Sequence, residues 1–237
     1  MKYFIPILSL CLLLANCQST TERLARFEVH GIDISHHQRT INWDTVATQS
    51  IDFAFIKATE GGDFRDTCFS YNWSELKKVG IKRGAYHFFH PTRSGQLQAT
   101  NFIQTVPLHF GDLPPVVDFE VVNNVPKKEL IKQLQTWLDV VEAHYKIRPI
   151  IYTNQKLYFK YLLTDFEDYP IWMARYNSKE PLLLANQDWT FWQYGNRGSV
   201  KGIDGPVDLN VFHSDLLALE NLGLSPETAI SNLMVRQ

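Results

Sequence analysis

Two carboxylates, Asp118 and Glu120, stand two residues apart in the mostly apolar segment 114–120. If this segment is a β-strand, both side chains project to the same side, with Cα atoms about 6.6 Å apart. Cleavage of a glycosidic bond needs such a pair, because one acid protonates the leaving oxygen while a second carboxylate stabilises or attacks the sugar cation, or activates water. The spacing also fits a strand end whose two acids simply face solvent, and both interpretations stay open for this segment alone.

The elements that would position the pair follow from alternating strand-like and helix-like patterns. Strands are expected at 28–34, 51–58, 83–89, 115–120, 149–153, 171–176, 190–194 and 207–212, and helices at 44–49, 73–79, 97–106, 126–145 and 155–163. Repeated strand–helix units predict a parallel sheet, and the last strands have no long helices between them. We therefore predict an α/β fold with an irregular TIM-like barrel. An open doubly wound sheet is the alternative, weakened because no Gly-rich phosphate loop is present.

Several acidic residues fall where the expected strands end: Asp33, Glu60, Asp118, Glu120 and Asp208. In α/β barrels the active site lies at the C-terminal ends of the strands, so these residues are candidates for one pocket. The chain has 237 residues and a formal net charge of −2, which fits a single barrel and gives no electrostatic case for binding nucleic acid.

The N-terminal segment predicts export. Residues 4–15 form an apolar run that is too short to span a membrane and fits a signal peptide. The run ends in Leu14-Ala15-Asn16-Cys17, which resembles a bacterial lipoprotein box, although Asn16 departs from the usual small residue before the Cys. An ordinary secretory signal with an incidental Cys17 is the alternative. Gln18, by resemblance to Gram-negative lipoproteins, favours a lipid anchor in the outer membrane, if the host is Gram-negative, with the protein facing the cell wall.

The expected organisation is a signal peptide at 1–16, a lipidated Cys17 with a short tether to residue 27, a barrel at 28–220 and a C-terminal tail at 221–237. If Cys11 leaves with the signal and Cys17 carries lipid, only Cys68 remains, so no intramolecular disulfide is expected. We expect Cys68 to be a small buried apolar residue.

Nine short motifs follow one another along the chain. They are residues 31–38 (GIDISHHQ), 41–43 (INW), 52–61 (DFAFIKATEG), 84–89 (GAYHFF), 115–120 (PVVDFE), 151–154 (IYTN), 171–176 (IWMARY), 191–195 (FWQYG) and 207–210 (VDLN). In this order, from Gly31 to about Leu216, the chain resembles the glycoside hydrolase family 25 muramidases, the Chalaropsis-type lysozymes. Arg39 and Ser50 stand where a Gly is frequent in the family, and neither is at an expected catalytic position.

The resemblance implies a (β/α)5(β)3 barrel that hydrolyses the β-1,4 bond between N-acetylmuramic acid and N-acetylglucosamine in the glycan strands of peptidoglycan. It implies no metal and no organic cofactor, and we expect a monomer. Glu120 matches the general acid. Asp118 matches the second carboxylate, which could steady the oxocarbenium-like state, position the substrate's own N-acetyl group or attack directly. The resemblance favours retention through substrate assistance.

Asp33 and Asp208 would line the same pocket, because a closed barrel brings its first and last strands together. Candidate sugar-binding residues are Tyr86, Tyr152, Arg175, Tyr176, Trp192 and Glu60. For the aromatic residues and the arginine, the alternative is that they pack in the core or against the residues that contact the sugar. For Glu60 the alternatives are pairing with Lys57 and capping the Gly61-Gly62 turn.

Four histidines, His36, His37, His87 and His90, invite a zinc site, but their spacings do not form a strong ligand set and the carboxylates explain the site without metal. Three other functions stay open: a non-catalytic peptidoglycan-binding lipoprotein, a barrel hydrolase of another N-acetylhexosamine polymer such as chitin, and an exported toxin against competitors. The first predicts loss of the acid or its partner, yet Asp118 and Glu120 are both present.

Overall fold

The computed structural model describes residues 25–176, 179–184 and 187–226. The expected signal peptide, Cys17 and most of the expected tether lie outside the described residues. Across the described ranges, no helix is long and apolar enough to cross a membrane.

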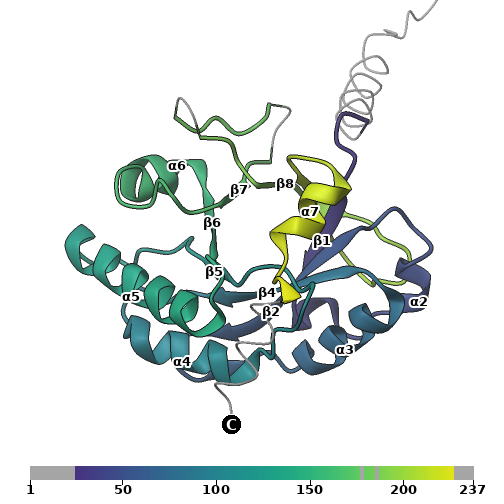
Figure 1. The fold of residues 1–237 in the computed structure, drawn as a ribbon, viewed down its shortest axis with the longest axis horizontal. Coiled ribbons are helices and arrows are strands. Elements are labelled where there is room, and N and C mark those ends of the chain that lie inside the picture. Colours follow the sequence, from purple (N-terminus) through teal and green to yellow (C-terminus); the bar gives the residue numbers. More distant parts are fainter. Residues whose placement is uncertain (1–24, 177–178, 185–186, 227–237) are drawn as a thin grey trace, which may run out of the picture.

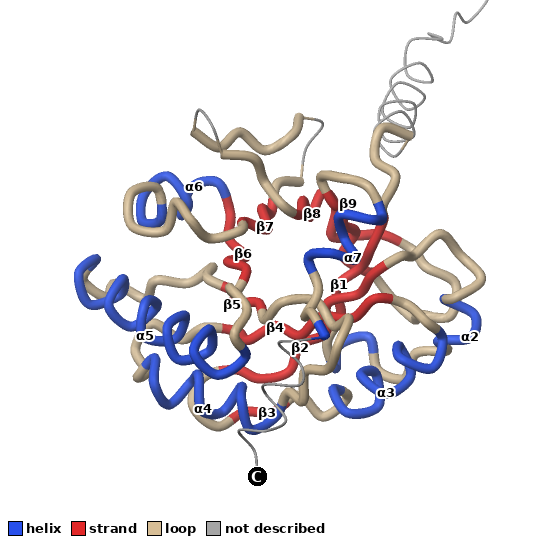
Figure 2. Tube along the Cα trace, viewed as in Figure 1, coloured by secondary structure: helices blue, strands red, loops and turns tan. Residues whose placement is uncertain are grey.

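Within these ranges, eight strands close into a barrel in the spatial order β1, β9, β8, β7, β6, β5, β4, β2, and β2 pairs back with β1 (Figure 2). Their bounds are β1 His30–Ile34, β2 Phe53–Glu60, β4 Lys82–Phe88, β5 Val116–Asp118, β6 Ile150–Asn154, β7 Ile171–Ala174, β8 Phe191–Gly198 and β9 Val207–Phe212; the short β3, Phe64–Arg65, pairs with the end of β2. Among the eight barrel strands, neighbours other than β9 run parallel, whereas β9 runs antiparallel to both β8 and β1.

Helices follow the first five barrel strands. They are α2 Trp43–Val46, α3 Phe69–Val79, α4 Gly95–Thr105, α5 Lys127–Tyr145 and α6 Gln155–Leu157, which continues as a π-helical turn at Tyr158–Leu162. Helices α2 to α5 flank one side of the ring, while a long loop covers β7 and β8 (Figure 1). In the described chain, β7, β8 and β9 follow one another without an intervening helix. The predicted irregular TIM-like barrel is therefore confirmed.

Helix α5 shows how the helical layer is built from the sequence. Leu130, Leu134, Trp137, Leu138 and Val141 recur at intervals of three and four, so they share one face, and all five are buried. Helix α5 also contacts α4 closely at Gly95, where a Cβ would lie 2.1 Å from the carbonyl oxygen of Gln133. Only glycine fits that approach, so the two helices pack backbone to backbone at this point.

Large aromatic rings fill the interior of the barrel. Phe53 and Phe55 of β2 lie over Gly31 of β1 and Gly84 of β4, where a Cβ would come within 2.4 Å and 2.3 Å of the respective rings. The two glycines therefore create the space that the rings occupy. Leu219 belongs to this same interior cluster.

Leu219 comes from α7, Leu216–Leu222, which lies across the ring in Figure 1. Because β9 ends at the N-terminal end of the parallel strands, α7 closes that end of the barrel and leaves the other end open for a site. The sequence patterns did not predict this helix. The expected boundary between barrel and tail at residue 220 falls inside it.

Two local expectations were wrong. Strand β5 ends at Asp118, so Glu120 lies beyond the strand. The Phe119 N–H still donates to the carbonyl of Tyr152 at 2.9 Å, but the Phe119 carbonyl accepts from the hydroxyl of Thr153 at 2.8 Å. Cys68 is only partly buried, at the N-terminus of α3.

Candidate active site

A cavity of about 310 Å³ opens where the parallel strands end. Its lining includes the four expected carboxyl groups, those of Asp33, Asp118, Glu120 and Asp208, and three of the expected aromatic residues, Tyr86, Tyr152 and Tyr176. The barrel therefore brings side chains from the beginning and the end of the domain's sequence around one cavity. Their roles in binding or catalysis remain predictions.

Barrel closure brings Asp33 and Asp208 together. Asp33 of β1 is directly opposite Asp208 in the ladder between β1 and β9. Because β9 is antiparallel, its first residues lie at the end of the barrel where β1 finishes, which explains how a residue at the start of a strand joins the site. Their carboxyl groups are hydrogen-bonding partners.

Gln193 of β8 orients Asp33 from one side. Its carbonyl oxygen accepts hydrogen bonds from the hydroxyls of Tyr152, at 2.8 Å, and Tyr176, at 2.6 Å. With the oxygen occupied in this way, its NH2 group faces Asp33 and donates to Oδ2 at 2.8 Å. The two tyrosines thus fix the Gln193 amide in the orientation in which it donates to Asp33.

Asn210 of β9 orients Asp33 from the other side. The indole N–H of Trp172 donates to the side-chain oxygen of Asn210 at 2.8 Å, and the Asn210 NH2 donates to the same Oδ2 of Asp33 at 2.7 Å. Neither Gln193 nor Asn210 was a candidate from the sequence. The alternation of strand β9 could have found Asn210, since it lies two residues after Asp208 and therefore on the same face.

Burial dominates the electrostatics of this pair. Loss of water raises the pKa of Asp33, the neighbouring Asp208 raises it further, and the hydrogen bonds from Asn210 and Gln193 only partly oppose the shift. Burial also raises the pKa of Asp208. Two carboxyl groups this close do not both ionise readily, so one proton is held between them in the acidic to neutral range.

Asp118 is the last residue of β5, and it lies between Phe88 of β4 and Tyr152 of β6 in the sheet. Its pKa is raised well above the ordinary value, first by burial and then by the charges of Glu120 and Asp33. One carboxyl oxygen, Oδ1, is buried and has no hydrogen-bond partner within the described residues. A buried acceptor without a partner is rare in a folded protein, and it is suited to accept an N–H from a ligand.

Glu120 lies at the mouth of the cavity, where water reaches its side chain. The surrounding protein still removes enough water to raise its pKa; the charge of Lys57 lowers it and that of Asp208 raises it. A carboxyl group with a raised pKa retains its proton closer to neutral pH and can therefore serve as a general acid.

Three expected sugar-binding residues do not line this cavity. The Trp192 ring is buried beside Trp189 and Phe27, and its N–H donates to the carbonyl of Arg175 at 2.9 Å. The guanidinium of Arg175 donates to the carbonyl of Glu180 at 3.0 Å. Glu60 pairs with Lys57, which was its alternative role.

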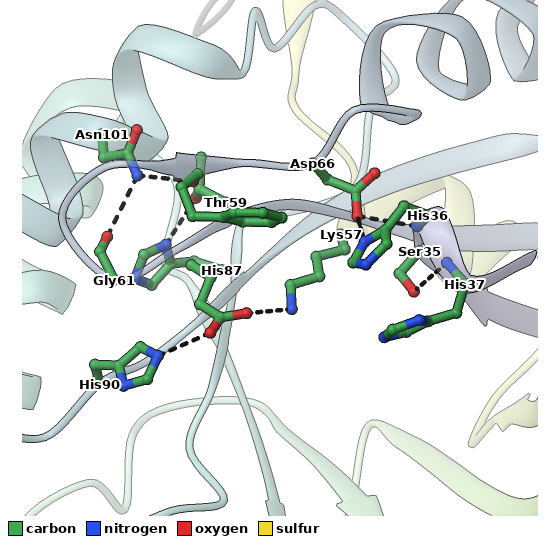
Figure 3. A network of polar contacts seen from close by, with 12 residues as sticks. Ser35, His36, His37, Lys57, Thr59, Gly61, Asp66, His87, His90 and Asn101 are labelled. Carbon is green, nitrogen blue, oxygen red and sulfur yellow. Dashed lines mark hydrogen bonds and ion pairs between the residues drawn. The ribbon is translucent and has the colours of Figure 1, made fainter. Parts of the chain in front are cut away.

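The four histidines have separate partners. His36 pairs with Asp66 at 2.7 Å, while His87 contacts the hydroxyl of Thr59 at 2.7 Å (Figure 3). His37 lines the cavity and its ring packs against that of His36. Among the described residues, no three His, Cys, Asp or Glu side chains are grouped so that they could hold a metal ion.

Comparison with known proteins agrees with this geometry. The model of the glycosyl hydrolases family 25 matches residues 32–203. The chain is 42% identical over 201 residues to the uncharacterized protein YegX of Escherichia coli (strain K12), covering 83% of this chain and 74% of that protein. It is 36% identical over 214 residues to lysozyme M1 of Streptomyces globisporus, covering 81% of this chain and 71% of that protein.

Among solved structures, a family 25 glycosyl hydrolase from Bacillus anthracis superposes with a TM-score of 0.79 and 37% identity, covering 84% of this chain and 94% of that one. The family match covers Asp33, Asp118 and Glu120 and ends before Asp208. The chain belongs to glycosyl hydrolase family 25 and is a glycoside hydrolase.

Proposed function

We propose that this protein is an N-acetylmuramidase that hydrolyses the β-1,4 bond between N-acetylmuramic acid and N-acetylglucosamine in peptidoglycan. The observation that carries the proposal is the combination, in one cavity, of Glu120 with a raised pKa and Asp118 with a buried oxygen that has no partner. Relatives named lysozyme M1 and autolytic lysozyme support the choice of substrate.

Glu120 is the general acid in this proposal. It donates its proton to the glycosidic oxygen as the bond to the anomeric carbon breaks, and the leaving sugar departs as an alcohol. In the second step, the resulting carboxylate takes a proton from the water that attacks the anomeric carbon, which restores the acid.

Asp118 assists the substrate's own acetamido group. The unpartnered Oδ1 accepts the acetamido N–H, which makes the acetamido oxygen a better nucleophile toward the anomeric carbon. The cyclic intermediate is then opened by water from the opposite face, so the product keeps the β configuration. Asp33 and Asp208 line the same cavity, and their negative charge stabilises the cationic character that develops on the sugar.

Digestion of purified peptidoglycan sacculi tests the proposal. The products are reduced and analysed by mass spectrometry, with Glu120→Gln as the inactive control. We expect muropeptides with a reduced muramic acid end from the wild-type protein and none from the variant. Binding to sacculi without release would favour a binding module, and release from chitin oligomers alone would favour another N-acetylhexosamine polymer.

We also propose that the protein is exported and anchored through a lipid on Cys17, in the outer membrane if the host is Gram-negative. The support is the apolar run at residues 4–15 followed by the lipoprotein-like box. Metabolic labelling with a fatty acid analogue tests this, since the wild-type protein should take up label and Cys17→Ser should not. An unlabelled wild-type protein would contradict the anchor.

A further inference from the structure

Lys57 is a cation that lines the cavity together with the carboxyl groups. It comes from β2, only 10% of its side chain is exposed, and it lines the cavity that holds Asp118 and Glu120. Its Nζ lies 4.9 Å from the centre of the Phe88 ring and 5.7 Å from that of Phe64, so aromatic faces stabilise the charge from two sides.

Glu60 binds this ammonium group. Lys57 Nζ donates to Glu60 Oε2 at 2.6 Å. The other oxygen of Glu60, Oε1, lies 2.9 Å from His90 Nε2. Glu60 does not line the cavity, so its direct contact with the lining is made through Lys57.

The His90 backbone is itself fixed by a buried side chain of α4. The Gln98 oxygen accepts the His90 backbone N–H at 2.8 Å, while the Gln98 NH2 donates to the His90 carbonyl at 3.0 Å. Gln98 is fully buried. A continuous set of contacts therefore runs from α4 through His90 and Glu60 to the ammonium group of Lys57.

We propose that Glu60 and His90 are positioning residues that hold Lys57 on the cavity wall and thereby set the pH range in which Glu120 can act as an acid. This inference rests on the proposed role of Glu120. The charge of Lys57 lowers the pKa of Glu120 and opposes the effect of burial. If Lys57 were released from Glu60, its flexible side chain would move toward the carboxylates and oppose protonation of Glu120 more strongly.

Other titratable groups also face this part of the cavity, and none of them is substituted in the variants compared below. They are Asp33 of β1, His37 of the following turn, Tyr86 of β4, Asp118 of β5, Tyr152 of β6, Tyr176 after β7 and Asp208 of β9. The charge of Glu60 acts on Asp118 as the smallest of several influences, while Glu120 responds to Lys57 and Asp208.

The test is the pH profile of kcat/KM on soluble peptidoglycan fragments, whose alkaline limb reports loss of the acid's proton in the free enzyme. Glu60→Gln should move this limb to lower pH by about half a unit to one unit, a loss of roughly 3–10-fold at a pH above the limb. Lys57→Met should move it by a similar amount to higher pH. In the double variant the limb should stay where Lys57→Met places it.

His90 is tested by a matched pair. His90→Leu should shift the limb in the same direction as Glu60→Gln, while His90→Gln, whose amide can still donate to Glu60, should restore it. Glu75→Gln is the control, because Glu75 pairs with Lys78 at the same sequence spacing but away from the Glu120 cavity. This variant should leave the limb unchanged.

An unmoved limb in Glu60→Gln would overturn the proposal, as would an equal shift from Glu60→Gln in the Lys57→Met background. Failure of the proposed function would give a different result: Glu120→Gln would keep its activity and its alkaline limb. A purely structural role for Glu60 would lower the melting temperature and leave the limb in place.

Discussion

Asp33 and Asp208 lie opposite each other across the seam where the first and last strands of the barrel pair. The seam therefore does two things at once: it closes the barrel and brings two carboxyl groups into one buried space. Two amides, from Gln193 and Asn210, donate to Asp33, so the pair is held in a defined geometry. Burial and proximity make these two charges costly, which has consequences for stability that can be measured.

The first prediction concerns the pH dependence of stability. The folded protein binds more protons than the unfolded chain above the ordinary Asp pKa, because the pKa values of Asp33 and Asp208 are raised. The free energy of unfolding should therefore fall as pH rises through these raised values. Asp208→Asn removes one of the two acids and should flatten this slope, measured as the melting temperature across mildly acidic to mildly alkaline buffers. An equally steep slope in the variant would contradict the assignment.

The second prediction concerns Asp118. Asp118→Asn should lower kcat by about 10²–10³-fold, the usual effect of removing one preorganised electrostatic group. The same variant should be more stable at neutral pH, by about 0.5–2 kcal/mol, because a buried charge with a raised pKa is replaced by a neutral amide. At a pH below the ordinary Asp pKa, the two proteins should have the same free energy of unfolding. Urea unfolding at both pH values measures the difference, and a variant less stable at neutral pH would count against it.

The third prediction concerns the amide of Gln193. Gln193→Leu leaves the buried Tyr152 hydroxyl without its acceptor and removes one donor from Asp33. We expect a loss of about 1–3 kcal/mol in the free energy of unfolding, and a further rise in the pKa of Asp33 because a hydrogen bond that lowers it is gone. Denaturant unfolding together with NMR titration of the carboxyl groups measures both effects. Wild-type stability in this variant would show that the network is dispensable.

The fourth prediction separates stability from activity. Arg83 and Asp112 form a buried ion pair in which Arg83 Nε donates at 2.7 Å and Nη2 at 3.1 Å. Arg83 lies near the start of β4, at the barrel end opposite the cavity, so Arg83→Met should cost about 3–5 kcal/mol without changing kcat of the folded enzyme. The control is Arg148→Met, which removes an exposed pair with Glu142 and should change stability by less than about 1 kcal/mol. Equal effects of the two substitutions would refute the distinction.

Much of the fold could be predicted because its strands carry strong local patterns. The alternation of strand-like and helix-like segments indicated a barrel whose last strands join directly. The spacing of Asp118 and Glu120 alone left glycosidic chemistry and a solvent-facing strand end both open, and the ordered motifs indicated the family. Helix α7 was missed because its seven residues give a weak periodic signal and its packing partners, the rings inside the barrel, are distant in the sequence.

The side chains that orient the carboxyl groups were harder to predict from the sequence. Whether Gln193 supports Asp33 depends on which way its amide faces, and that is set by two tyrosines on other strands. Trp192 illustrates the opposite case: an aromatic residue in a motif gave no sign that its ring packs outside the cavity. Such orientations depend on contacts between strands that are remote in the sequence.

The closing strand also has a consequence for biosynthesis. Asp33 gains its hydrogen bond from Asn210 only when β9 is in place, and Asn210 follows Asp33 by 177 residues in the chain. A nascent chain that has not yet emerged as far as β9 has an open barrel and only part of the carboxyl cluster. An unfinished or truncated chain that lacks β9 therefore lacks both Asp208 and the amide that donates to Asp33, so the carboxyl cluster is assembled only near the end of synthesis.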